Sequence, residues 1–122
     1  MVGIDIVSVS RIRESIENAV FVKRVFTAVE QNYCNKRPNS AESYAGIFCA
    51  KEAAVKALGV GFGTGIMPTD IVVTHAASGA PVLKFYRSAA ELFKPYNSSV
   101  SISHDGDYAV AAVELTAKGE TK

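Results

Sequence analysis

SAESYAGIFCAKEAAVKALG, residues 40–59, predicts a long helix that is apolar on nearly all of its sides. Such a helix belongs in the interior of a domain, where other elements cover it. Its C-terminal half nevertheless carries Lys51, Glu52 and Lys56, and charged groups are costly to bury unless they have partners. The first question about this sequence is therefore what these three charges contact.

Signals on both sides of this helix predict an α+β fold. Ser40 can cap its beginning and Gly59 its end, while Thr27 and Glu30 have the spacing of a capping box. The order of elements favours helices packed on one face of a mainly antiparallel sheet. The other predicted elements are a strand over 2–7, with Val2, Ile4 and Ile6 on one face and Gly3, Asp5 and Val7 on the other, helices over 8–20, 28–34 and 87–94, and strands over 69–75, 82–86, 98–104 and 107–115, the last two separated by an Asp105-Gly106 turn.

Length and composition indicate one globular domain over residues 1–122, with a frayed tail at 116–122. The formal net charge is +1, so no overall charge attracts nucleic acid or a membrane surface. Two cysteines are too few for a disulfide framework. We find neither a signal peptide nor an apolar run of about 18 residues, and we therefore expect a cytoplasmic protein.

Two carboxylates are candidates for a metal site. Glu52 and Lys56 lie one helical turn apart, a pattern that an exposed ion pair on a solvated face explains equally well. Asp5 stands in an apolar strand, where it needs a hydrogen-bond donor, a cation or water, and a role in capping a helix is one solution. If the long helix crosses the strand there, Asp5 and Glu52 could bind Mg²⁺ together with waters and substrate phosphates. Lys56 could then contact a phosphate.

Other candidate residues have weaker signals. His104 ends a predicted strand beside a turn, from which a side chain can reach a cleft, although an ordinary surface histidine also fits; His75 has no constellation around it. The loop GVGFGTGIMP (59–68) lets backbone amides approach a ligand, but it follows its helix, whereas a P-loop precedes one. The basic residues of the N-terminal helices form either a solvated face or a dock for an acidic protein. They are Arg11, Arg13, Lys23 and Arg24.

The motifs taken together resemble the holo-acyl-carrier-protein synthase family, the short phosphopantetheinyl transferases, over nearly the whole chain. A lone Lys-Glu-x-x-x-Lys would be a weak signal, whereas the ordered set is specific. The matching segments are VGIDIVSVSRI (2–12), FTAVE (26–30), FCAKEAAVKALG (48–59), GTGI (63–66), SGAP (78–81) and SISHDGDYAVAAV (101–113).

The resemblance implies an activity and a set of partners. The family transfers the 4′-phosphopantetheine arm of coenzyme A to a serine of apo acyl carrier protein, releases adenosine 3′,5′-bisphosphate and requires Mg²⁺. This places the chain in lipid metabolism, with fatty acid biosynthesis as the expected pathway and the carrier itself unidentified. Members are typically homotrimers with active sites at subunit interfaces. The carrier is acidic and docks on the basic N-terminal helices, for which Arg11 is the best candidate, followed by Arg13 and Arg24.

The resemblance also assigns site residues. Asp5 and Glu52 fall on the family's metal-binding carboxylates, Lys56 on its phosphate-binding lysine and His104 on a histidine of the coenzyme site. Glu52, directly or through a metal-bound water, is the first candidate for the base that takes the serine proton, and His104 is the second. Further coenzyme contacts are expected from Gly63, Thr64, Gly65 and Ser103.

Some positions depart from the family pattern. Ile47 stands where a polar residue such as Arg is common, Val20 stands where a basic residue is usual, and GVGF (59–62) adds a turn to the loop. Lys51 could contact coenzyme or only solvent. The alternative to a transferase is a non-catalytic coenzyme A-binding or trimeric scaffold module, and a nucleic-acid-binding domain is disfavoured by the absence of interleaved aromatic and basic residues. The transferase is favoured by the retained set Asp5, Glu52, Lys56 and His104.

Overall fold

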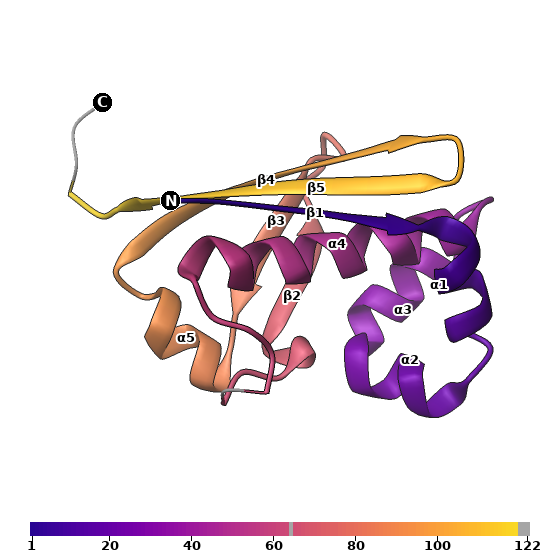
Figure 1. The fold of residues 1–122 in the computed structure, drawn as a ribbon, viewed down its shortest axis with the longest axis horizontal. Helices are drawn as coiled ribbons and strands as arrows, with labels where there is room; N and C mark the ends of the chain where they lie inside the picture. Colours follow the sequence, from indigo (N-terminus) through magenta and orange to yellow (C-terminus); the bar gives the residue numbers. More distant parts are fainter. Residues whose placement is uncertain (64, 120–122) are drawn as a thin grey trace.

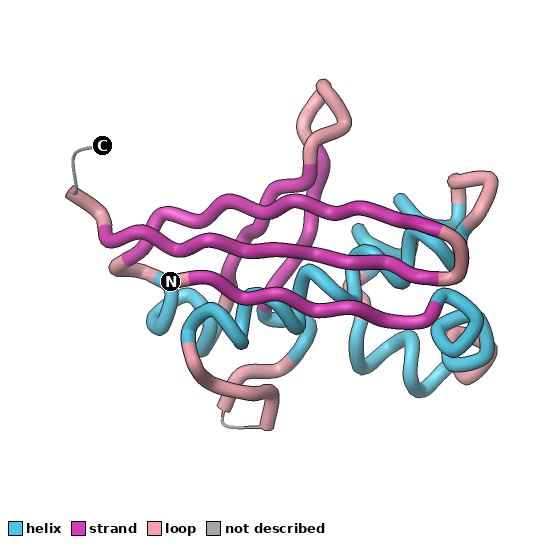
Figure 2. Tube along the Cα trace, turned by 45° about the horizontal axis from the view of Figure 1, so that its top comes forward, coloured by secondary structure: helices cyan, strands magenta, loops and turns pink. Residues whose placement is uncertain are grey.

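Helix α4 (Ser40–Leu58) runs along one face of a three-stranded antiparallel sheet (Figure 1). The computed structural model describes residues 1–63 and 65–119. The strand order is β1-β5-β4, and Figure 2 shows these strands side by side. The bounds of the strands are Val2–Ser8 for β1, Tyr96–Asp105 for β4 and Tyr108–Ala117 for β5. The remaining elements are α1 (Val9–Ser15), α2 (Ala19–Val25), α3 (Ala28–Asn35), the 3₁₀ helix η1 (Pro68–Asp70), β2 (Ile71–His75), β3 (Pro81–Phe85) and α5 (Arg87–Phe93).

The predicted α+β architecture is confirmed. Every strand pair is antiparallel, and in Figure 1 the helices lie on one side of the three-stranded sheet. The strands form two sheets instead of one, because β2 and β3 pair only with each other. No helix among the described residues has the length and apolar character needed to cross a membrane.

Two local predictions are corrected and one is confirmed. The expected helix over 8–20 is two helices, α1 and α2, because the Asn18 side chain accepts hydrogen bonds from the next turn and starts a new helix there. Asn39, and not Ser40, caps α4, since its side chain accepts from the main-chain N–H of Glu42. The predicted capping box of Thr27 and Glu30 is present.

The C-terminal hairpin also differs in detail from the prediction. Asp105 pairs with Tyr108, so the two turn residues are Gly106 and Asp107, and Gly106 adopts the positive φ of 57° that such turns need. β5 extends to Ala117, and therefore residues 116 and 117 of the predicted tail belong to the sheet. Residues 120–122 of that tail lie outside the described residues.

β1 touches α4 backbone to backbone because residue 3 is a glycine. A Cβ at Gly3 would overlap the main-chain carbonyl of Ala53 and the main-chain nitrogen of Ala57. Both alanines are buried, so the small-residue side of α4 is the side that meets the strand. Asp5, two residues along β1, therefore faces the helix. The alternation predicted for this strand holds, and the residues exposed on its far face are Val2, Ile4 and Ile6.

Candidate active site

Lys56 reaches from α4 to β1 and pairs with Asp5. Its Nζ lies 2.9 Å from Asp5 Oδ1 and donates to the main-chain oxygen of Ile4 at 3.2 Å. The Asp5 side chain is 15% exposed and the Lys56 side chain 51%, so the pair lies where the strand–helix contact meets solvent. The ion pairs among residues 1–63 and 65–119 do not include the Glu52–Lys56 pair that helical spacing allowed.

Glu52 lies close enough to Asp5 for the two carboxylates to repel each other. The pKa of Glu52 is raised, first by burial and then by the negative charge of Asp5, while Lys56 opposes the shift. The buried thiol of Cys49 is also near, and its pKa is raised to about 12, first by burial and then by Asp5, so it stays neutral at pH 7. Lys56 pairs with Asp5 and not with Glu52, so a further cation is favourable beside the two carboxylates.

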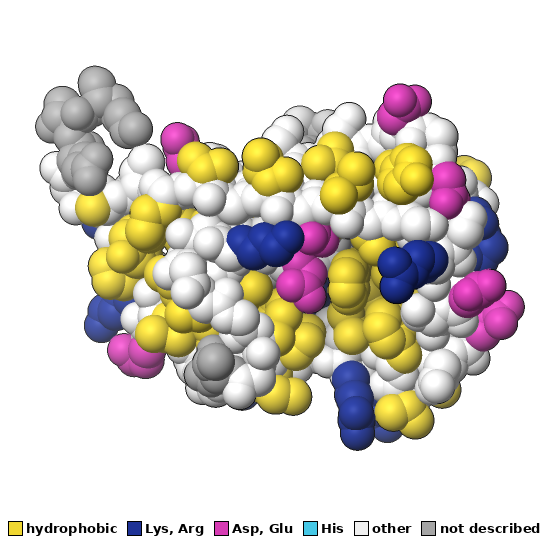
Figure 3. Space-filling view, in the orientation of Figure 1, with side chains coloured by type: hydrophobic (Ala, Val, Ile, Leu, Met, Phe, Trp, Pro, Cys, Tyr) yellow, Lys and Arg dark blue, Asp and Glu magenta, His cyan; other side chains and the backbone are white. Residues whose placement is uncertain are grey.

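These carboxylates line an open groove of about 340 Å³ between β1, α4 and the N-terminal helices. Figure 3 shows acidic side chains beside a basic one near the middle of this face, with hydrophobic side chains around them. The groove therefore combines two carboxylates and one guanidinium with aromatic and aliphatic walls. Its lining is Asp5, Ile6, Val7, Arg11, Ile12, Ser15, Phe21, Phe48 and Glu52.

His104 lies in a different pocket of the same chain. This pocket has a volume of about 200 Å³, and its lining includes Gly46 of α4 together with Gly79 and Pro81 of the predicted Ser-Gly-Ala-Pro turn. His104 Nε2 lies 3.0 Å from the main-chain oxygen of Glu42. Gly46 makes room for the ring, because a Cβ there would lie 3.1 Å from Nε2. Within one chain, the structure thus brings Asp5, Glu52 and Lys56 together and leaves His104 apart from them.

The other predicted coenzyme contacts lie at two further places. Ser103 precedes His104 on β4, so its side chain is on the opposite, solvent-exposed face of the sheet. Gly63 and Gly65 have positive φ values of 96° and 100° in the loop after α4, and a side chain there would meet nothing within 4 Å. Both glycines are therefore needed for the path of the loop and not for close packing. Thr64 lies outside the described residues.

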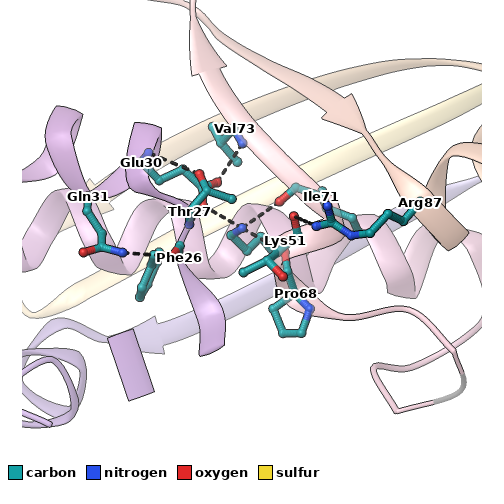
Figure 4. Close-up of polar contacts among 10 residues, drawn as sticks. Phe26, Thr27, Glu30, Gln31, Lys51, Pro68, Ile71, Val73 and Arg87 are labelled. Carbon is teal, nitrogen blue, oxygen red and sulfur yellow. Dashed lines mark hydrogen bonds and ion pairs between the residues drawn. The ribbon is translucent and has the colours of Figure 1, made fainter. Parts of the chain in front are cut away.

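Lys51 is buried and is a structural residue, so neither expected role, coenzyme contact or solvent exposure, applies. Figure 4 shows its ammonium among groups from α3 and from the segment that follows the glycine loop. Nζ lies 2.8 Å from Glu30 Oε1 and donates to the main-chain oxygens of Pro68 at 2.9 Å and Ile71 at 2.6 Å. Glu30 also accepts from the main-chain N–H groups of Thr27 and Val73. The buried charges are thus satisfied on both sides.

The predicted docking arginines are all exposed. Arg11 and Arg13 lie on α1, and Arg24 lies in the last turn of α2. Only Arg11 lines the groove that contains the carboxylates. The structure therefore gives Arg11 a place beside the candidate site that the other two do not share.

The sequence did not predict a stack of Tyr33, His75 and Arg37, which lies in the same pocket as His104. The rings of Tyr33 and His75 are parallel within 6°, with centroids 3.8 Å apart, and the Arg37 guanidinium lies 5.4 Å from the Tyr33 centroid. Burial lowers the pKa of His75, and the charge of Arg37 lowers it further. The spacing of four residues between Tyr33 and Arg37 could have indicated their contact. No local pattern connects Tyr33 to His75, which lies on a strand some forty residues later.

The donor set of the groove is small. Among the described residues, no group of three or more His, Cys, Asp or Glu side chains could hold a metal ion. Asp5 and Glu52 are a pair of hard oxygen donors on a rigid strand and helix. Such a pair fits an ion that takes its remaining ligands from water and a phosphate-bearing substrate.

Comparisons with known proteins point to one family. Residues 1–113 match the sequence model of the 4′-phosphopantetheinyl transferase superfamily. The holo-[acyl-carrier-protein] synthase of Geobacter metallireducens is 43% identical over 118 residues, which cover 93% of this chain and 94% of that protein. The corresponding protein of Clostridium tetani is 45% identical over 114 residues, or 90% of each chain.

Solved structures give the same result for the fold. The crystal structure of Helicobacter pylori holo-[acyl-carrier-protein] synthase in complex with coenzyme A has a TM-score of 0.85 to this chain at 34% identity. The superposition covers 95% of this chain and 100% of that one. The resemblance predicted from the ordered motifs is thereby confirmed over nearly the full length.

Proposed function

The chain belongs to the 4′-phosphopantetheinyl transferase superfamily, and we infer that it transfers the 4′-phosphopantetheine group of coenzyme A to a serine of apo acyl carrier protein. The other product is adenosine 3′,5′-bisphosphate. The observation that carries this inference is the groove lined by Asp5 and Glu52, with Lys56 paired to Asp5, in a chain similar over most of its length to holo-[acyl-carrier-protein] synthases. We further propose that residues 1–122 act as one domain, in the cytoplasm, in fatty acid biosynthesis.

We propose that Asp5 and Glu52 hold Mg²⁺. The pKa of Glu52, raised first by burial and then by the charge of Asp5, supports this because a cation between the carboxylates would relieve their repulsion. When bound, the ion would supply positive charge to the diphosphate of coenzyme A as negative charge develops on the leaving oxygen. Lys56, which pairs with Asp5 here, has a flexible side chain that could also reach a phosphate oxygen beside the carboxylates.

Glu52 is the proposed base. The acceptor serine oxygen forms a bond to the phosphorus that carries the pantetheine, and the bond from that phosphorus to the oxygen of adenosine 3′,5′-bisphosphate breaks. Glu52, directly or through a water, takes the serine proton. His104 is the second candidate for this role. Lys56 would balance the negative charge that passes to the leaving diphosphate oxygen.

We propose a homotrimer with active sites between subunits. The far face of the three-stranded sheet supports association, because Val2, Ile4 and Ile6 are 63%, 58% and 63% exposed there, and such an apolar patch usually marks an interface. An intersubunit site would also give His104 and Ser103 a role, because the groove of one chain could be completed by the coenzyme-binding residues of its neighbour. Gly63, Thr64 and Gly65 stay proposed coenzyme contacts of this site.

We propose that the acidic carrier protein docks on α1 and α2. Arg11 is the principal candidate because it is exposed and also lines the groove, so it lies where the acceptor serine must arrive. Arg13 and Arg24 extend the basic surface away from the groove and would act mainly on the association rate.

The test is incubation of the protein with apo acyl carrier protein, coenzyme A and Mg²⁺, followed by mass spectrometry of the carrier. We expect a mass gain of one phosphopantetheine, loss of that gain with EDTA, and strong loss in Asp5→Asn and Glu52→Gln. Lys36→Ala, a change on an exposed lysine away from the groove, is the control and should transfer normally. Absence of a mass gain with several carriers, while coenzyme A still binds, would refute the transferase and favour the non-catalytic module.

A further inference from the structure

Asp107, in the turn between β4 and β5, holds the beginning of α1. Its Oδ1 accepts from the main-chain N–H of Ser10 at 2.9 Å and from Ser10 Oγ at 2.6 Å, and its Oδ2 accepts from Ser8 Oγ at 2.7 Å. Its main-chain oxygen accepts from the N–H of Val9 at 2.7 Å. Four hydrogen bonds thus join the first turn of α1 to a turn almost 100 residues away in sequence.

These contacts supply what α1 lacks. The first turn of α1 contains no acidic residue, and its cap Ser8 accepts only from the N–H of Arg11, at 3.3 Å. A carboxylate at a helix N-terminus satisfies free N–H groups and favours the helix dipole. The hydrogen bonds from the two serines lower the pKa of Asp107, and the charge of Arg13 lowers it slightly further, so the carboxylate is ionised at neutral pH.

α1 is the element that forms one wall of the candidate site. Its Arg11, Ile12 and Ser15 line the groove opposite Asp5 and Glu52. The helix has only seven residues, and a helix of this length depends on its ends and its packing for a fixed position. Whatever fixes the first turn of α1 therefore fixes Arg11 relative to the carboxylates.

We propose that Asp107 is a positioning residue for the carrier protein, because it ties α1 to the β4–β5 turn and thereby sets Arg11 at the mouth of the groove. This inference rests on the proposed function, in which Arg11 contacts the acidic carrier. If Asp107 positions α1, its replacement should weaken the reaction with the carrier, whereas electrostatics alone predicts that it should strengthen association. Asp107 is an exposed negative charge beside a surface for an acidic partner, so its removal should favour association unless its position matters more.

The experiment compares Asp107→Ala with Asp105→Ala. Both remove one exposed negative charge from the same hairpin end, but Asp105 makes no hydrogen bond to α1 among the described residues. We expect Asp107→Ala to lower kcat/KM for apo carrier about three- to tenfold, as loss of a helix cap would. The KM for coenzyme A should stay within about twofold, and Asp105→Ala should not lower kcat/KM for the carrier. Asp107→Asn, which keeps one oxygen acceptor, should recover part of the loss.

A double variant tests whether the effect passes through Arg11. Arg11→Ala alone should lower kcat/KM for the carrier, and adding Asp107→Ala should lower it little further, because the group being positioned is already absent. Equal losses in Asp107→Ala and Asp105→Ala, a rise in the KM for coenzyme A as large as the effect on the carrier, or additive losses with Arg11→Ala would overturn the proposal. If Asp107→Ala has no effect while Arg11→Ala does, only this inference fails. If wild-type protein transfers nothing, the proposed function fails.

Discussion

At the scale of single residues, the neighbouring charged residues Lys51 and Glu52 of α4 differ in burial. Lys51 points into the core and is 1% exposed, whereas Glu52 points toward the groove. Lys51 gathers Glu30 and two main-chain oxygens around its ammonium, so the region just after the glycine loop is anchored to the middle of the helix. A buried lysine next to a candidate catalytic residue is therefore a structural support, and its loss should act first on stability.

Lys51→Met should destabilise the fold by about 3–5 kcal/mol, because it leaves Glu30 buried without its cation. Adding Glu30→Gln should restore part of the loss, since the double variant buries no unpaired charge. Urea unfolding followed by circular dichroism measures both. Lys56→Met is the matched control on the same helix and should change stability by no more than about 1 kcal/mol, because the Lys56 pair is exposed. A Lys51→Met variant as stable as wild type would show that the ion pair contributes nothing.

At the scale of elements, the contact of β1 with α4 places the candidate site. The strand brings Asp5 and the helix brings Glu52 and Lys56, and they meet because no side chain at Gly3 holds the two backbones apart. Antiparallel pairing with β5 holds β1 in register and places Asp5 opposite Ala111. A change in this single contact should therefore affect both the packing and the site.

Gly3→Ala should cost about 1–3 kcal/mol, the usual effect of overpacking, because its Cβ would meet main-chain atoms that cannot turn away. The shift of β1 should also reduce transfer activity, since it moves Asp5 from Glu52. Thermal unfolding and the carrier mass assay measure the two effects. Gly61→Ala is the control: its added Cβ would meet nothing within 4 Å and its stability should be nearly unchanged. Wild-type stability in Gly3→Ala would mean that β1 and α4 separate at little cost.

The sequence predicted most of the elements, because caps, alternation and helical spacing are local signals. The neighbourhood of Asp5 with Glu52 and Lys56 came from the resemblance to the family, because no local signal connects residues of β1 to α4. The sequence could not predict that Lys51 pairs with Glu30 or that Asp107 holds α1, because these contacts join residues about 20 to 100 positions apart. The Tyr33–His75 stack was missed for the same reason. The break between α1 and α2 was missed because apolar spacing continues through it, and only the competing hydrogen bonds of Asn18 end the first helix.

At the scale of the whole molecule, one sheet is covered on a single side. α4 covers one face, while the far face presents β-branched residues of β1 and the ring of Tyr108, which is 55% exposed. A shallow groove between the strands of that face is lined by Val2, Ser99, Val100, Ser101, Ala112, Val113 and Glu114. Such a face is costly to leave in water and gives the proposed trimer a surface to bury.

Ile4→Glu should dissociate the proposed trimer, because it places a charge among the exposed apolar residues of β1 on that face. Light scattering coupled to size-exclusion chromatography should show a fall to the mass of one chain. Val29→Glu replaces a residue of similar exposure, 60%, on α3 and should leave the mass unchanged. A wild-type protein that already runs as a monomer at micromolar concentration would rule out the trimer.

The close contact of Gly3 with α4 bears on whether the proposed metal site would prefer Mg²⁺ or Ca²⁺. Gly3 fixes the separation of the two main chains that carry Asp5 and Glu52. Ca²⁺ has longer bonds and asks for more oxygen ligands than Mg²⁺, and sites that bind it well are usually supple. If the proposed site binds Mg²⁺, a fixed main-chain separation at Gly3 would therefore favour the smaller ion.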